Sequence, residues 1–228
     1  MRHAKRLASI GIAWWFALLL CATIIGAAAW GFSGGMCTVT AHADREFHLN
    51  EDMDTFRQIL VRSNSTEAIL NHSGMKLLEE STEAVDIDLS KDAKPLRNFL
   101  RGKSKANVTA TKHLKVQLND PELAATELVL RQDCHIEPEN IQIVTTSDRP
   151  AGELKMYSTS LDAIRNEKGT DVKLTIDMTV EVKVSYLFRS QARYRVQQAA
   201  IKSLEEQEVA LRKLAENTTV GPMIRVRR

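Results

Sequence analysis

Hydrophobic and polar residues alternate along most of this chain, and the period of the alternation changes along its length. In residues 172–188 the even-numbered positions are apolar and nearly all odd-numbered positions are polar. A period of two predicts a β-strand with one buried face and one solvated face. In residues 190–217 the period becomes 3.6, which predicts a long amphipathic helix.

The residues before this strand predict further strands and two short helices. A first strand is expected up to Leu49, with apolar side chains on one parity that only Arg45 breaks. Asn50 is the expected N-cap of a first helix. A second helical stretch, interrupted by Gly74, is expected from Ser65 to Leu78, so that the region forms two short helices or one broken helix. A strand at 85–89 is expected to lead into a polar loop. Alternating segments separated by turn residues then predict an antiparallel meander of strands at about 108–118, 127–136, 141–146 and 153–159.

The order of these elements defines an α+β fold class. A curved antiparallel sheet with a long C-terminal helix packed on it resembles the helix-grip fold of START-type domains, the SRPBCC group. The resemblance covers about residues 36–216 and rests on element order alone, so it assigns no binding residue. It implies a sheet that wraps the final helix and that often encloses an apolar cavity.

Residues 8–31 contain no charged side chain. At 1.5 Å per residue such a helix spans about 36 Å, enough for a hydrocarbon core of about 30 Å. Basic residues occur before this segment and not directly after it, so the positive-inside rule places the N-terminus in the cytoplasm. We therefore expect a cell-membrane, single-pass protein with a retained signal anchor that contacts the lipid bilayer; a cleaved secretory signal is the alternative.

These expectations divide the chain into four parts. They are a basic cytoplasmic tail (1–7), a transmembrane helix (8–31), an extracytoplasmic α+β domain (36–217) and a flexible tail (218–228).

The net charge of +2 changes little in this picture, because Arg2, Lys5 and Arg6 account for the whole positive excess. Aromatic residues are only 5% of the chain and charges of both signs are interspersed, so no nucleic-acid partner is expected. Cys37 and Cys134 either form a disulfide or remain two separate thiols.

No catalytic, cofactor-binding or metal-ligating constellation stands out, since the histidines are dispersed and Asp86 and Asp88 fit the wet side of a strand. We therefore expect no enzyme and no cofactor. The expected function is the binding of an apolar ligand, such as a lipid, or of a protein partner; the alternative is a structural subunit of an envelope assembly. A pocket between sheet and final helix is expected to be lined by Ile176, Met178, Val180, Val182, Val196, Ala200 and Leu204, and the alternative is a filled core.

Overall fold

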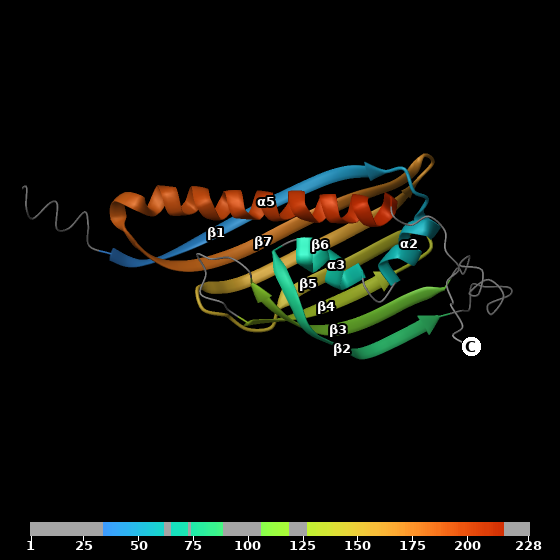
Figure 1. Ribbon diagram of the computed structural model, residues 1–228, viewed down its shortest axis with the longest axis horizontal. Helices are drawn as coiled ribbons and strands as arrows, with labels where there is room; N and C mark the ends of the chain where they lie inside the picture. Colours follow the sequence, from blue (N-terminus) through green and yellow to red (C-terminus); the bar gives the residue numbers. More distant parts are fainter. Residues whose placement is uncertain (1–33, 62–64, 73, 89–105, 119–126, 217–228) are drawn as a thin grey trace, which may run out of the picture.

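The computed structural model describes residues 34–61, 65–72, 74–88, 106–118 and 127–216. Seven antiparallel strands form one sheet in the order β1-β7-β6-β5-β4-β3-β2, and the helices lie on one of its faces (Figure 1). The strands are β1 (Gly34–Leu49), β2 (Met75–Asp88), β3 (Asn107–Leu118), β4 (Glu127–Ile136), β5 (Asn140–Ser147), β6 (Leu154–Asn166) and β7 (Gly169–Ser185). The helices are α2 (Met53–Val61), α3 (Ser65–His72), the 3₁₀ turn η1 (Tyr186–Phe188) and α5 (Arg189–Glu216).

The helices divide the covered face of the sheet between them. The long α5 packs along β1 and β7, α3 contacts β2 and α5, and α2 contacts α3, β6 and β7 (Figure 1). Side chains from both layers form one buried core, which includes Phe56 of α2, Leu130 of β4, Ile176 of β7 and Leu204 of α5. The curved antiparallel sheet with its long C-terminal helix confirms the expected helix-grip arrangement.

Arg45 is a charged residue among the apolar residues on the face of β1 that α5 covers. Its guanidinium reaches α5, where its Nε hydrogen-bonds with Glu208 and its Nη1 lies 3.4 Å from Glu205. Arg212, one turn after Glu208, donates to the same carboxylate at 2.8 Å. The charge that interrupts the apolar parity of β1 therefore joins this strand to the final helix.

Three local predictions differ from the structure. The helical stretch expected to run to residue 78 ends at His72, and β2 begins at Met75, because Gly74 adopts a positive φ of 73° that reverses the chain. The cap of α2 is Asp52 instead of Asn50, since its Oδ1 accepts the Thr55 backbone N–H at 2.8 Å. The period-2 segment ends as a strand at Ser185, and η1 follows it.

The transmembrane part of the predicted fold class needs correction. In the described part of the chain, no helix is long and apolar enough to cross a membrane. Residues 8–31, which carried the prediction of a signal anchor, lie outside the described residues. The described structure therefore does not support the expectations of a single-pass protein, a bilayer contact and a cell-membrane location.

Candidate functional site

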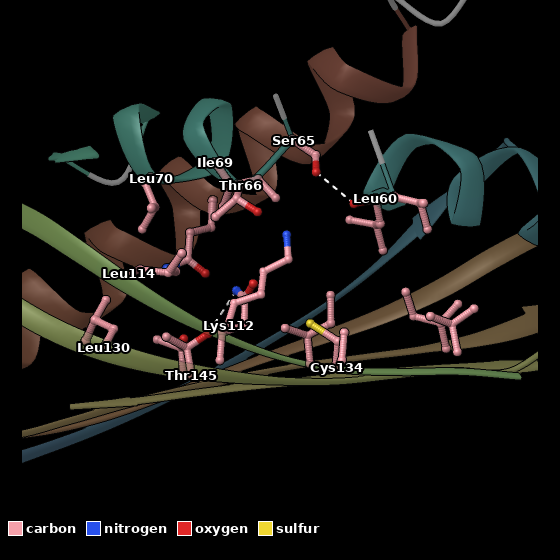
Figure 2. A pocket seen from close by; sticks show the side chains of 18 of the residues that line it. Leu60, Ser65, Thr66, Ile69, Leu70, Lys112, Leu114, Leu130, Cys134 and Thr145 are labelled. Atoms are coloured by element: carbon pink, nitrogen blue, oxygen red, sulfur yellow. Dashed lines mark hydrogen bonds between the residues drawn. The ribbon is translucent and has the colours of Figure 1, made fainter. Parts of the chain in front are cut away.

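A cavity of about 240 Å³ lies between the two short helices and the strands β3 to β6 (Figure 2). Ile69 and Leu70 of α3 form part of its roof, and Leu60 of α2 lies beside them. The floor includes Leu114 of β3 and Leu130 of β4, which are fully buried. Apolar side chains on both sides leave a hollow in the core where the helices and the sheet do not meet.

Two residues of the cavity lining are exposed, and they mark where the cavity reaches solvent. Val61 at the end of α2 and Val85 of β2 belong to its lining, and they are 62% and 55% exposed. Lys112 of β3 extends into the space between α3 and the sheet (Figure 2). Its Nζ lies 2.7 Å from Oε1 of Glu80 on β2, and both side chains are about one quarter exposed. The cavity thus combines exposed apolar residues in its lining with the ion pair between Lys112 and Glu80.

One row of the cavity floor is polar. The strand register aligns Lys112 with Gln132, Gln132 with Thr145, and Thr145 with Thr159. Side chains of directly paired residues lie on the same face of a sheet, so these four point to the helix side. We call these four residues the polar row.

The rows on either side of the polar row are largely apolar. Ala110, Cys134 and Ile143 are aligned on one side, and Leu114 pairs with Leu130 on the other. The polar row therefore crosses an otherwise hydrophobic surface.

A buried tyrosine lies beside the polar row, under α5. The hydroxyl of Tyr157 on β6 hydrogen-bonds with Ser203, Gln207 and Thr159, and Gln207 also lines the cavity. Burial raises the pKa of Tyr157 far above its ordinary value, although the three hydrogen bonds oppose this effect. The phenol is therefore neutral at neutral pH.

Cys134 places a thiol in the cavity wall (Figure 2). Burial raises its pKa to about 11, and the nearby Lys112 charge lowers it by less. A thiol with that pKa is protonated at neutral pH and is a poor nucleophile. Cys37 and Cys134 are both free, so the alternative of two separate thiols is the correct one.

The seven residues predicted to line a pocket lie elsewhere. Ile176, Val180, Ala200 and Leu204 are buried in the core between β7 and α5, and Met178, Val182 and Val196 pack against it half-buried. None of them lines the cavity described above. Their role in contacting a ligand stays a prediction, because no ligand is present to test it.

The acidic and histidine residues considered for chemistry do not converge in the cavity. Asp86 and Asp88 lie on the exposed edge strand β2. His113 neighbours Lys112 on β3 and points to the opposite face, where its Nε2 lies 3.1 Å from Oε2 of Glu83. His135 is exposed on β4.

The polar row could not be found from sequence periodicity. Lys112 of β3 and Gln132 of β4 each stand between apolar residues of the same parity, and such single breaks are common in strands. Only the register of four strands shows that the breaks coincide.

No family model matches the sequence, and no curated protein matches it. Solved structures do share the fold. An aromatase/cyclase from Streptomyces sp. R1128 is 16% identical over 78% of this chain and 94% of its own, with a TM-score of 0.46. A START superfamily protein from Mycobacterium smegmatis is 12% identical over 77% and 97%, with a TM-score of 0.43. A di-domain aromatase/cyclase of the steffimycin biosynthetic pathway is 8% identical over 78% and 53%, with a TM-score of 0.44.

These matches are likenesses of fold alone. They also correct one expectation. The expectation that the chain is not an enzyme is corrected, because structures named aromatase/cyclase are among those similar to it. Residues for a specific reaction are not identified by that likeness.

Proposed function

We propose that this helix-grip domain binds a small apolar ligand in the cavity between α2, α3 and the sheet. The observation that carries the proposal is the cavity itself: it is enclosed mainly by aliphatic side chains and reaches solvent beside Val61 and Val85. Apolar hollows with a few placed polar groups are the usual form of small-molecule sites.

The volume limits the size of the ligand. A cavity of about 150 Å³ lined by apolar side chains accommodates benzene. The cavity here measures about 240 Å³, which suits a molecule of about two fused rings. Naphthalene, with ten carbon atoms, is therefore a suitable probe.

The expected affinity follows from ligand size. Small ligands gain between about 0.3 and 1.5 kcal/mol per non-hydrogen atom. At about 0.6 kcal/mol per atom, naphthalene would gain about 6 kcal/mol, which corresponds to a Kd on the order of 40 µM. Isothermal titration calorimetry of the full chain measures affinities in this range.

A pair of variants on one strand tests where the probe binds. Ala110 lines the cavity, whereas Thr109 precedes it on β3 and is exposed on the opposite face. Ala110→Leu adds three carbons to the cavity and should weaken naphthalene binding by about tenfold or more. Thr109→Leu should leave the Kd within twofold. Equal effects of the two substitutions, or an absence of naphthalene binding to the unaltered chain, would refute the proposal.

A further inference from the structure

The polar row faces a cavity in the core, which is an unusual place for polar side chains whose only role is structural. A filled core at this place would use aliphatic residues, as Ala110, Ile143, Leu114 and Leu130 do in the neighbouring rows. Lys112, Gln132, Thr145 and Thr159 instead present polar atoms to the same cavity that the aliphatic residues enclose. Buried polar atoms are costly unless they find hydrogen-bond partners.

The internal bonds of the polar row leave donors available. Gln132 donates from Nε2 to Oγ1 of Thr145 at 3.2 Å. A hydroxyl that accepts this bond still has its own proton to donate. The ammonium group of Lys112 has three N–H donors, of which one is directed to Glu80. The row can therefore offer hydrogen bonds to an acceptor inside the cavity.

The charge at the row favours an acceptor without a charge of its own. Glu80 already balances Lys112 at 2.7 Å. A carboxylate entering the cavity would lose its hydration and would also lie near the carboxylate of Glu80. A hydroxyl or carbonyl oxygen loses much less on leaving water.

We propose that the ligand of this cavity is an apolar ring compound that carries one uncharged oxygen, hydroxyl or carbonyl, and that Thr145 of the polar row donates a hydrogen bond to this oxygen. The remainder of the ligand contacts the apolar rows and α3. This inference depends on the proposed function and adds the chemical class of the ligand and the residue that selects it.

Three probes of the same ring system separate the contributions of the rings, of a neutral hydroxyl and of a negative charge to the binding affinity. Naphthalene has no polar group, 2-naphthol adds a neutral hydroxyl at pH 7, and 2-naphthoate adds a negative charge. Since one hydrogen bond contributes about 1 kcal/mol, 2-naphthol should bind about fivefold tighter than naphthalene to the full chain. The charged 2-naphthoate should bind most weakly of the three.

The matched variants are Thr145→Val and Thr146→Val. Valine has almost the shape of threonine and suits a strand, so both variants should fold; circular dichroism and the unfolding midpoint check this. Thr145 faces the cavity, whereas Thr146 is the next residue on β5 and faces away from it. Thr145→Val should reduce the preference for 2-naphthol to less than twofold and leave the Kd of naphthalene within twofold. Thr146→Val should keep the fivefold preference.

Each other outcome has a distinct meaning. If naphthalene binds but 2-naphthol gains nothing, or if Thr145→Val keeps the preference, the assigned role of Thr145 is wrong and the proposed function stands. If 2-naphthoate binds most tightly, the ligand class is wrong because Lys112 selects an anion. If none of the three probes binds, both the inference and the proposed function fail.

Discussion

Glu208 of α5 should contribute more to stability than any other carboxylate between the final helix and β1. Its side chain is only 12% exposed and accepts hydrogen bonds from Arg45 and Arg212. The substitution Glu208→Gln keeps the size of the side chain and removes its charge. A hydrogen bond to a charged group contributes about 1.5 to 3 kcal/mol, but the two arginines are about 40% exposed and regain water when the charge is lost. We therefore expect a loss of about 1.5 to 2 kcal/mol in the free energy of unfolding at pH 7.

Glu205 provides the matched control. It lies one turn before Glu208, contacts the same Arg45 at 3.4 Å and is 53% exposed. Exposed ion pairs contribute about 0 to 1 kcal/mol, so Glu205→Gln should cost less than about 0.5 kcal/mol. Urea unfolding followed by circular dichroism measures both values.

The pH dependence of this effect has a definite sign. Burial by itself would raise the pKa of the Glu208 carboxyl, but the hydrogen bonds from Arg45 and Arg212 outweigh burial and lower it below its ordinary value. A lowered pKa in the folded state stabilises the protein above the ordinary carboxyl pKa, and this stabilisation is lost as the pH falls through the lowered value. The difference between the unaltered chain and Glu208→Gln should therefore be largest near neutral pH and shrink in acid. A Glu208→Gln variant as stable as Glu205→Gln at pH 7, or a difference that grows in acid, would show that the ion pairs do not hold α5 on β1.

Two further predictions concern a thiol and a turn. Changing the other two cysteines of the chain, Cys21 and Cys37, to serine leaves Cys134 as the single thiol. Because burial raises its pKa to about 11, Cys134 should react with iodoacetamide at pH 8 about a hundredfold more slowly than glutathione. A rate within tenfold of that of glutathione would contradict this. Gly169→Ala should lower the free energy of unfolding by about 2 kcal/mol or more, because its φ is 151° and a Cβ would lie 2.1 Å from the carbonyl oxygen of Leu49. Gly74→Ala is the control, with a φ of 73° and open space around the position, and it should cost only about 1 kcal/mol; equal losses in urea unfolding would refute the steric explanation.

The strongly periodic elements could be predicted from the sequence. Strand β7 and helix α5 each extend over enough residues to show their period clearly. Because they follow a meander of strands, their order predicted a final helix packed on an antiparallel sheet. Residues 75–78 show where this reasoning fails. Leu77 and Leu78 fit a helix as well as a strand when only a short run of sequence is considered. The turn at Gly74 and the pairing of β2 with β3 make this segment a strand.

The position of the cavity could not be predicted, for a different reason. The sequence identified an apolar stripe on α5 and an apolar face on β7, and it was natural to expect a ligand between them. Those two surfaces are complementary and fill each other, so Ala200, Leu204 and Ile176 are almost completely buried. The hollow occurs where the short α3 must cover strands at the other side of the sheet. A gap of this kind depends on the lengths and angles of packed elements, and hydrophobic periodicity contains neither.

The polar row shows that a binding site in a sheet depends on register as much as on composition. Successive members of the row, Lys112, Gln132, Thr145 and Thr159, are 13 to 20 positions apart in the chain, and antiparallel pairing brings them side by side. A shift of one residue in a strand would turn its member of the row to the outer face, because successive side chains point to opposite sides. The same shift would expose that strand's buried aliphatic residues, such as Leu130 or Ile141, to water. The hydrophobic core that stabilises the sheet therefore also fixes the alignment of the polar row, and the row costs the fold little beyond the hydrogen bonds that its four side chains must find.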